Sequence, residues 1–398
     1  MFNFRVGMNR LVKYMFNWAN LCLFFYCSSI MAAPIKYEFN YLKLIKKQVA
    51  TFTNLNKQPE DSGYQGAKLA IEDSNTTGKF LQQKFILHYF EFEAPQALLD
   101  KIKARYAIGE YIFFLDVPEN LLIKADVWAQ GKGVLLFNVS ESADALRYKH
   151  CLKSVLHTIP SNAMKSDALA QWLVTRRLQD ILLIKGMSSE DEAIATSFKR
   201  SVKRFGLTVM GEKTWDFDTD LRRSTQQEIP LFTQTTSSYD VVYVADKYKD
   251  FSEFLPFNTY LPRPVVGGAG LEALAWHRVI EQWGAAQLQT RFTKLSSRDM
   301  NEVDFSGYLA VRSVAQATQN VRSNDGAKII EFIRSPDFEL AAYKGRKLSY
   351  RAWNGQLRMP IALVQPNAFV SQSPQEGMLH PQTELDTLGF DVQEMQCN

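Results

Sequence analysis

The chain has 398 residues, of which 46% are hydrophobic and 22% are charged, and its formal net charge at neutral pH is +4. These proportions are typical of a folded globular protein and exclude a disordered or low-complexity chain. The small net charge excludes an extensive basic surface, so we expect no nucleic-acid partner.

The N-terminus has the three-part layout of a secretory signal peptide. Three basic residues come first, then an apolar run and a stretch of small residues: Arg5, Arg10 and Lys13, then 21–26, then 28–33. The apolar run is too short for a membrane span. We therefore predict that 1–33 is a cleaved signal peptide and that the mature protein lies in the periplasm. The alternative, a lipid-modified Cys22 or Cys27, lacks the small residues expected before it.

Removal of this leader leaves two cysteines, Cys151 and Cys397. An even pair in an oxidising compartment is a candidate disulfide, which would tie the C-terminus to the middle of the chain. Two free thiols are the alternative, because the sequence does not give their separation.

Apolar runs of strand length alternate with helical patterns along the mature chain, which predicts βα units and parallel sheets. A first series of strands is expected at 39–45, 85–90, 111–115 and 133–138, with helices at 61–78, 95–105 and 118–130. The first helix begins at the N-capping pair Asp61-Ser62 and ends at the turn Asn75 to Gly78. This series predicts one complete α/β lobe.

A second series of the same design predicts another lobe. Its strands are expected at 180–186, 207–215 and 239–245, with helices at 190–205 and 219–228. After these come a mostly helical stretch at 271–333, a hairpin at 338–358, a strand at 360–364 and an irregular tail. The mature chain is too long for one typical core, so we expect two domains: 36–157 plus about 270–345, and 158–269 plus about 346–398.

The segment 61–78, DSGYQGAKLAIEDSNTTG, resembles the first helix of the leucine/isoleucine/valine-binding type I periplasmic receptors, where a Gly-Ala-x-x-Ala helix ends in an Asn-x-x-Gly turn. Its small residues would let the helix lie close to the sheet, and Gly78 suits a left-handed C-cap. The resemblance implies an α/β type I periplasmic-binding-protein fold, with two Rossmann-like parallel-sheet lobes joined by a hinge.

Other segments resemble one narrower branch, the ABC-transporter substrate-binding proteins associated with pyrroloquinoline-quinone-dependent alcohol dehydrogenase systems. They span nearly the whole mature chain: LHTIPSNAM at 156–164, DALAQ at 167–171, YDVVYVAD at 239–246, FLPFNTYLPRPVV at 254–266, AWH at 275–277, EQWGAAQLQ at 281–289, WNGQLR at 353–358 and SPQEGMLH at 373–380. The resemblance does not supply the identity of the solute.

This resemblance implies a solute-binding component of an ABC transporter rather than an enzyme, and no cofactor. Its partners would be a small-molecule solute and an ABC permease in the inner membrane, and the protein would be a monomer. Solute would enter between the open lobes, and the closed form would be recognised by the permease. The alternative is a ligand-sensing or accessory subunit that binds a protein partner.

In such receptors the strands of each lobe end at the cleft, so the loops after them carry the ligand contacts. The candidate ligand-binding residues are Asp116, Asn138, Ser140 and Glu141 in the first lobe and Ser161, Ser188 and Asp246 in the second. Tyr260 and Trp276 are candidates for an apolar wall. Each has a structural alternative, because Ser and Asp after strands are often helix N-caps and Trp276 often packs lobes together.

The loop after the third strand departs from the amino-acid receptors, which have a Gly/Ser-rich loop there. Here Asp116 and Pro118 occupy that place. A carboxylate repels the carboxylate of an amino acid, and proline has no amide donor. A neutral or cationic solute is therefore at least as plausible as an amino acid.

Several sharper motifs do not change this prediction. The Gly268-x-Gly270 loop after an apolar strand lacks the acidic strand end of a dinucleotide site and is read as a tight strand-to-helix turn. The acidic run at 216–220 lacks the Gly and Glu of a calcium loop. No ligand spacing joins the five histidines, so no metal site is predicted: His88, His150, His157, His277 and His380. No hydrolase, zinc-protease or phosphate-loop motif is present either.

Overall fold

The computed structural model describes residues 34–45, 58–216 and 221–397, with the backbone alone for 221–226. The predicted signal peptide and most of the acidic run at 216–220 lie outside the described residues. Within the described ranges, no helix combines the length and the apolar character needed to cross a membrane.

The first lobe is built on a five-stranded parallel sheet with the order β2-β1-β3-β4-β5. Its strands are β1 (Ile35–Leu44), β2 (Gln83–Phe92), β3 (Ile112–Asp116), β4 (Leu135–Asn138) and β5 (Val155–His157). The connecting helices are α2 (Tyr64–Leu81), α3 (Pro95–Ala107), α4 (Glu119–Ala129) and α5 (Ala145–Tyr148). Because every pair is parallel, all carboxyl ends lie along one edge of the sheet.

The alternation of side chains along β1 explains how this sheet is covered on both faces. Tyr37, Phe39 and Tyr41 lie in a core cluster that includes residues of α2. Leu42 and Leu44 lie in a second cluster with residues of α3 and α4. Each such side chain contributes about 1.5–3 kcal/mol on burial, so both layers stabilise the lobe.

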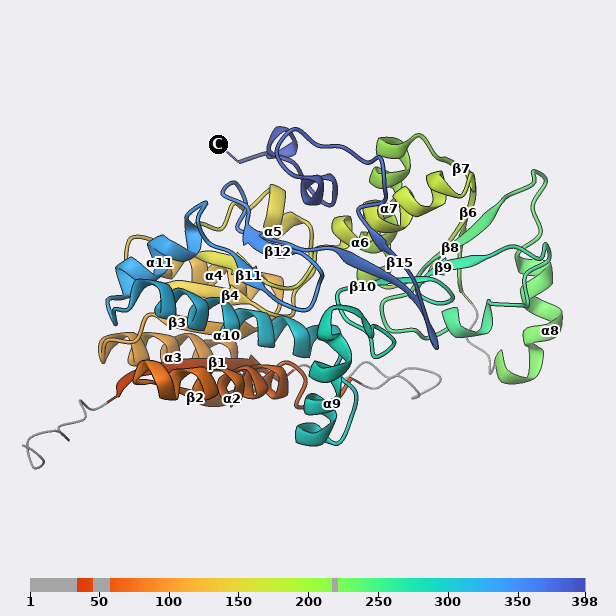
Figure 1. The fold of residues 1–398 in the computed structure, drawn as a ribbon. Coiled ribbons are helices and arrows are strands. Elements are labelled where there is room, and N and C mark those ends of the chain that lie inside the picture. The colour runs from red at the N-terminus through yellow and green to blue at the C-terminus, as the bar shows by residue number, and fades with distance from the viewer. Residues whose placement is uncertain (1–33, 46–57, 217–220, 398) are drawn as a thin grey trace, which may run out of the picture.

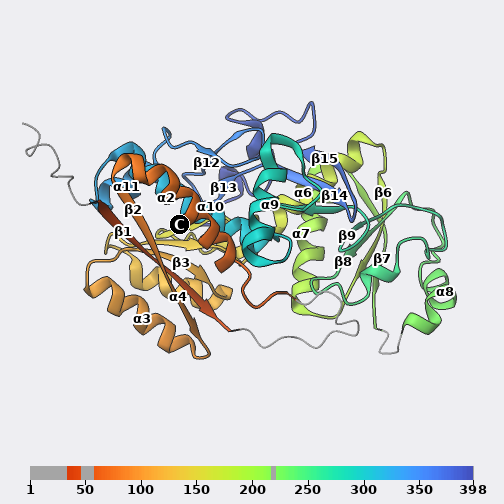
Figure 2. The same cartoon turned by 60° about the horizontal axis from the view of Figure 1, so that its bottom comes forward.

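The second lobe is built on a four-stranded parallel sheet with the order β7-β6-β8-β9. Its strands are β6 (Asp180–Lys185), β7 (Thr208–Thr214), β8 (Val241–Ala245) and β9 (Val265–Gly267). Its helices are α6 (Asn162–Thr175), α7 (Ser189–Phe205) and α8 (Leu221–Phe232), with a 3-10 turn η1 (Ser252–Phe254). The two parallel sheets confirm the predicted α/β class, and they lie at opposite ends of the molecule (Figures 1 and 2).

The remaining elements join the lobes. Helices α9 (Ala285–Ser296), α10 (Glu302–Val321) and α11 (Gly326–Arg334) lie on the first lobe, where α10 packs on α2 and α11 and α9 contacts α2. Strands β10 (Glu272–Leu274), β14 (Ile361–Gln365) and β15 (Ala368–Ser373) form a sheet against α6. Strands β11 (Leu340–Ala341), β12 (Lys347–Tyr350) and β13 (Leu357–Arg358) form another. The chain thus crosses between the lobes after β5, after β10 and after β13.

Three expectations for α2 need correction. The helix begins at Tyr64, with Gly63 at the N-cap position and no side-chain cap, rather than at Asp61-Ser62. Gly78 does not cap this helix, which continues to Leu81 and ends at Gln82 in the left-handed conformation (φ 55°). The small residues bring α2 close to α10 rather than to the sheet alone. A Cβ on Gly66 would lie 1.7 Å from the carbonyl oxygen of Asp304, and a Cβ on Gly307 would lie 2.3 Å from that of Gly63, so both helix positions need glycine.

The return segment also differs from the prediction. The stretch after Gly270 forms strand β10 before any helix, because Glu272–Leu274 pairs with β14. The strand-to-helix turn expected at Gly268 is therefore a strand-to-strand turn, in which Gly267 has φ 105° and Gly270 has φ 72°. The tail is not irregular throughout, since it contains β15 and the 3-10 turns η3 (Glu384–Thr387) and η4 (Val392–Glu394).

Candidate functional site

The loop that follows β4, residues 139–144, bridges the two lobes. The carbonyl oxygen of Ser142 accepts a hydrogen bond from the backbone amide of Asn162 at 3.0 Å. The Asp144 carboxylate accepts one from the amide of Ala163 at 2.9 Å. Asn162 and Ala163 begin α6 of the second lobe, so this loop lies where the carboxyl edges of both sheets approach each other.

Two buried side chains hold this loop in place. Asn138 donates to the carbonyl oxygen of Glu141 at 2.8 Å and bonds His157 Nδ1 at 2.9 Å, while its Oδ1 accepts from the amide of Glu141 at 2.9 Å. Arg147 donates to the carbonyl oxygens of Glu141 and Ala143 at 2.7 and 2.9 Å. The polar atoms of the Asn138 side chain therefore all form hydrogen bonds within the lobe. Asn138 stabilises the loop and is not expected to bind the solute itself.

Among the predicted residues of the first lobe, Ser140 and Glu141 have side-chain oxygen atoms that can still form hydrogen bonds with a solute. The Oγ atom of Ser140 is buried and has no hydrogen-bond partner. A buried hydroxyl without a partner costs free energy and is uncommon in folded proteins. The Glu141 carboxylate accepts one bond, from the amide of Ala143 at 3.0 Å. Both residues are only partly buried overall, although the Ser140 hydroxyl oxygen itself is buried.

Tyr248 belongs to the second lobe and was not among the predicted residues. It follows β8, and its hydroxyl donates to Glu190 Oε1 at 3.1 Å. Burial, together with the negative charges of Glu190, Asp191 and Glu141, raises the pKa of the Tyr248 phenol to about 12. Glu141 belongs to the first lobe, so its charge acts on a side chain of the second lobe. The rule that loops after strands carry ligand contacts points to Tyr248 as well as to Asp246.

Two ion pairs lie next to this region. Lys249, which has a left-handed backbone (φ 54°), pairs with Glu272 at 2.6 Å. Lys165 of α6 pairs with Glu302 at the start of α10, so this second pair connects the two lobes. Burial raises the pKa of the Glu272 carboxyl, and the charge of Lys249 opposes that rise. The four side chains neutralise one another and leave no net charge.

Asp116 lies where it was predicted, at the carboxyl end of β3. Its carboxylate is 4.0 Å from Lys43 Nζ, and the side chains are 9% and 15% exposed. Asp116 is one of the negative charges that raise the pKa of the buried Tyr41 phenol, after burial itself. The next helix, α4, begins after Pro118 and carries Glu119 in its first turn. Both carboxylates of this corner have a basic side chain nearby, since His150 Nε2 lies 3.5 Å from Glu119.

The three predicted residues of the second lobe serve local roles. Ser161 caps α6 by accepting from the amide of Met164 at 3.2 Å. Ser188 caps α7 in a capping box with Asp191. The Asp246 carboxylate accepts from the amides of Phe251 and Ser252, both at 2.9 Å. All three lie at the carboxyl edge of the first or second sheet, but their side-chain acceptors are engaged, so a role in binding stays a prediction.

The predicted apolar wall needs correction. Trp276 is 1% exposed, stacks on Phe305 with ring centroids 4.6 Å apart and donates to Gln289 Oε1 at 3.1 Å. It is a core residue. Tyr260 lies shortly before β9, and its amide donates to Thr233 Oγ1 at 2.7 Å. This is the amino edge of the second sheet, opposite the edge that carries Asp246, because the sheet is parallel. Tyr260 therefore does not line the interlobe region.

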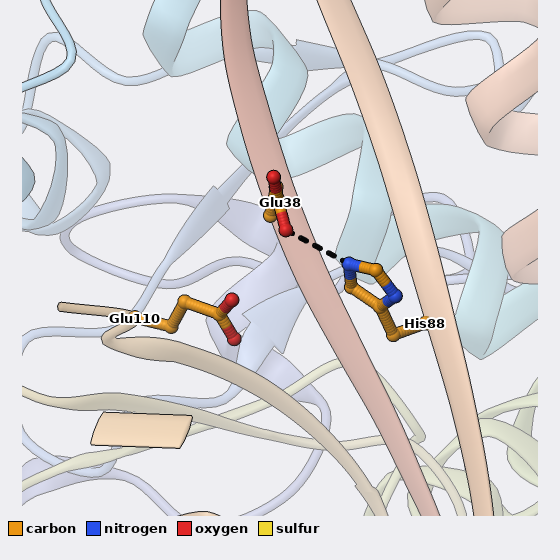
Figure 3. Close-up of side chains that lie close together, drawn as sticks. All are labelled: Glu38, His88 and Glu110. Carbon is orange, nitrogen blue, oxygen red and sulfur yellow. Dashed lines mark hydrogen bonds and ion pairs between the residues drawn. The ribbon is translucent and has the colours of Figure 1, made fainter. Parts of the chain in front are cut away.

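One group of side chains has the composition of a metal site. Glu38, His88 and Glu110 place their ligand atoms within 4.8 Å of one another. Figure 3 shows Glu38 and His88 on neighbouring strands, with His88 Nε2 and Glu38 Oε2 2.9 Å apart. However, Arg105 donates to Glu110 at 2.6 Å through Nε and lies 3.7 Å from Glu38. Its guanidinium supplies the positive charge that a cation would bring.

Two pockets among the described residues lie elsewhere. One, of about 420 Å³, is lined by residues that include Arg278, Asn367 and Phe369. The other, of about 310 Å³, is lined by residues that include Trp283 and Ser373. None of the predicted site residues lines either pocket, and both are next to β15 rather than between the carboxyl edges.

Cys151 and Cys397 form a disulfide in the structure, with their Cα atoms 5.8 Å apart. The bond joins positions 246 apart in the sequence and connects the C-terminal segment to the loop before β5. The free-thiol alternative does not describe this structure.

Comparison with known proteins identifies the fold. No family model and no curated protein matches the chain. Many solved structures are similar. One is a leucine-, isoleucine-, valine-, threonine- and alanine-binding protein from Brucella ovis in a closed conformation, with 15% identity, a TM-score of 0.61, and coverage of 87% of this chain and 93% of that one.

Two further solved structures show the same relationship. A branched-chain amino acid ABC transporter periplasmic ligand-binding protein from Burkholderia xenovorans is 14% identical, with a TM-score of 0.66 and coverage of 85% and 95%. A solute-binding protein from R. palustris in complex with benzoate is 13% identical, with a TM-score of 0.59 and the same coverage. The chain therefore has the fold of the type I periplasmic binding proteins, as predicted.

Proposed function

We propose that this chain is the extracytoplasmic solute-binding component of an ABC transporter and carries no catalysis of its own. One observation supports this most: polar groups lie at the carboxyl edges of both parallel sheets, and the charge of Glu141 in one lobe contributes to the raised pKa of the Tyr248 phenol in the other. Ser140 and Glu141 come from the first lobe and Tyr248 from the second. Ligands of open α/β sheets bind at such edges.

The unpartnered Ser140 hydroxyl suggests how a solute would bind. A solute that hydrogen-bonds this group satisfies a buried polar atom, and it gains contacts to Tyr248 only when the lobes are close. The solute then binds the closed form more tightly than the open form and shifts the population toward it. That closed form would be the one recognised by a permease in the inner membrane.

The charges in this region favour a neutral or cationic solute. Glu141 brings a carboxylate to this region. The carboxylates of Asp116 and Glu119 lie 4.0 and 3.5 Å from Lys43 and His150, and the amines of Lys249 and Lys165 are paired with carboxylates. Proline at position 118 removes one amide donor from the loop before α4. Solutes of the similar proteins named above include leucine and benzoate, which are both carboxylates. We propose that this chain departs from them in taking a ligand that has no carboxylate.

The remaining features of the proposal rest on the sequence. A cleaved leader at 1–33 would deliver the protein to the periplasm as a monomer, with no nucleic-acid partner. The association with a quinoprotein alcohol dehydrogenase system rests on the unusual segments such as 254–266, and the comparisons support the broader receptor class only. The division into lobes near residues 158, 270 and 346 also stays a prediction.

A thermal-shift screen of the mature protein tests the proposal. The panel contains alcohols, aldehydes, amines, amino acids, short acids, quinone cofactor and metal ions. A solute at 100 times its dissociation constant adds about 2.7 kcal/mol of stability, so a true ligand raises the melting temperature clearly. If no compound in the panel does so, while a pull-down recovers a protein partner other than a permease, the sensing or accessory role replaces this proposal.

A further inference from the structure

The last described residues of the chain, 384–397, form a segment that we call the C-terminal strap. Its far end is fixed to the first lobe. Cys397 is bonded to Cys151, and the amide of Gln396 donates to the carbonyl oxygen of Tyr148 at 2.8 Å. Tyr148 also stacks on Phe390 of the strap, with ring centroids 4.5 Å apart. Both Tyr148 and Cys151 lie between β4 and β5, within the first lobe.

The middle of the C-terminal strap is fixed to the second lobe by charge. Arg200 of α7 donates two bonds to the Glu394 carboxylate, at 2.9 and 2.6 Å. Asp167 of α6 is fully buried and accepts from the amide of Gly389 at 2.7 Å. Arg204 donates to both Asp167, at 2.8 Å, and the carbonyl oxygen of Gly389, at 2.9 Å. Charge-assisted bonds of this kind are the stronger ones in proteins.

Phe390 is the point where the two attachments meet. Its ring stacks on Tyr148 of the first lobe, and the Arg200 guanidinium of the second lobe lies 4.3 Å from the ring centroid. In Figure 1 the C-terminal strap, in dark blue, lies along the top of the molecule between α5 and α7. A single side chain therefore contacts both lobes.

We propose that the C-terminal strap is a disulfide-locked restraint on the opening of the two lobes. Between the lobes the chain already crosses after β5, β10 and β13. The strap is held by Arg351 and Arg358 at Asp386, contacts the second lobe at Gly389 and Glu394 and ends on the first lobe at Cys151, so the disulfide closes this path covalently. Any movement that separates Tyr148 from Arg200 must break the stack on Phe390 or the ion pair with Glu394. The restraint acts whether or not the chain delivers a solute to a permease.

Single-molecule energy transfer measures this restraint directly. Donor and acceptor dyes on genetically encoded ketone residues at Phe80 and Leu231, which are 86% and 67% exposed, report the distance between the lobes. A second pair at Phe80 and Val127 reports a distance within the first lobe. Both pairs are measured in the full mature protein and in its Cys151→Ser/Cys397→Ser variant. Ketone labelling leaves the native cysteines untouched.

We expect the interlobe distribution of the double variant to shift to longer distances and to broaden, while the intralobe distribution stays unchanged. Glu394→Gln cuts the attachment to the second lobe and should give a smaller shift in the same direction. Lys199→Gln is the matched control, because Lys199 also lies on α7 but pairs with Glu192 and Glu212 of its own lobe. It should give no shift.

An interlobe distribution that is identical in the wild-type protein and the double variant overturns the proposal. If the double variant also changes the intralobe distance, it has lost its native fold. In that case Glu394→Gln replaces it, and an interlobe distribution identical to that of the wild-type protein overturns the proposal. A shift for Lys199→Gln as large as that for Glu394→Gln also overturns it, because the effect would then belong to any charge removed from α7.

Discussion

Arg351 and Asp386 form an ion pair in which both side chains are buried. The Arg351 Nε donates to Asp386 Oδ1 at 2.7 Å, and the side chains are 1% and 0% exposed. Arg358 donates to the same carboxylate at 2.9 Å. The guanidinium of Arg351 also donates to the carbonyl oxygen of Leu388 at 2.6 Å. One carboxylate thus holds β12, β13 and the start of the C-terminal strap together.

Asp386→Ala should destabilise the protein strongly. Breaking a buried pair by removing one partner costs about 3–5 kcal/mol, because it leaves an uncompensated buried charge. Equilibrium urea unfolding of wild type and variant gives the difference. Glu384→Ala is the control, since Glu384 lies on the same 3-10 turn but pairs with Arg346 at the surface, where both side chains are more than 40% exposed. A surface pair contributes about 0–1 kcal/mol. Equal losses for the two variants would contradict this account.

Lys344 should make stability depend on pH above neutrality. Its side chain is 1% exposed, donates to the carbonyl oxygen of Ala275 and lies 5.3 Å from the centroid of the Phe305 ring. Burial lowers the pKa of the Lys344 amine to about 7, and the charge of Glu302 opposes that shift. Between this pKa and the usual value near 10.4, the unfolded chain binds a proton that the folded chain does not.

The free energy of unfolding should therefore rise with pH through this window, by up to ~1.4 kcal/mol per pH unit from Lys344. Lys344→Met removes the titrating amine and should flatten the curve. Urea unfolding at several pH values between about 7.5 and 9.5 measures both slopes. Parallel curves for wild type and Lys344→Met would show that the amine stays protonated in the folded protein.

Removal of Arg105 should create a metal site. Without the guanidinium, the Glu38 and Glu110 carboxylates lose their nearest cation, and His88 adds a nitrogen ligand suited to zinc. We expect Zn²⁺ to raise the melting temperature of Arg105→Ala and to leave that of the wild-type protein unchanged. Arg105→Ala/His88→Ala is the control and should lose the effect. A zinc response in the wild type that disappears in His88→Ala would mean that Arg105 does not exclude the metal.

The strands and their alternation with helices were predictable because apolar runs indicate which segments are buried. The ends of the helices and strands, and the short elements, were not predictable. Glu272–Leu274 becomes a strand only through β14, which lies far along the chain. The sequence could not show that α2 would continue past Gly78, because its end depends on Gln82 adopting a left-handed conformation. The local hydrophobic pattern thus predicts that a helix or strand forms, and contacts with distant residues determine where it begins and ends.

The candidate site was predictable as a region but not residue by residue. Asn138 ends β4 and Ser140 comes shortly after it, and the sequence does not distinguish between them as ligand-binding candidates. Only the tertiary structure shows that Asn138 is engaged by His157 while the Ser140 hydroxyl has no partner. Tyr260 was misplaced because the sequence does not show at which edge of a sheet a long loop folds. The pairing of its amide with Thr233 does.

Ser140→Ala separates binding from stability. Because the Ser140 hydroxyl is buried without a partner, its removal should leave the free energy of unfolding unchanged or slightly raised. A hydrogen bond to solute contributes about 0.5–1.5 kcal/mol, so the dissociation constant of a solute found by the thermal-shift screen should rise about 2-fold to 10-fold. Calorimetric titration of the variant measures this.

Ser161→Ala is the matched control, because Ser161 is also a serine at the carboxyl edge of the first sheet but its Oγ caps α6. Loss of such a cap costs about 0.5–2 kcal/mol of stability and need not weaken binding. The opposite pattern, with Ser140→Ala destabilised and its affinity unchanged, would place the Ser140 hydroxyl in the framework of the lobe and leave Glu141 and Tyr248 to bind the solute alone.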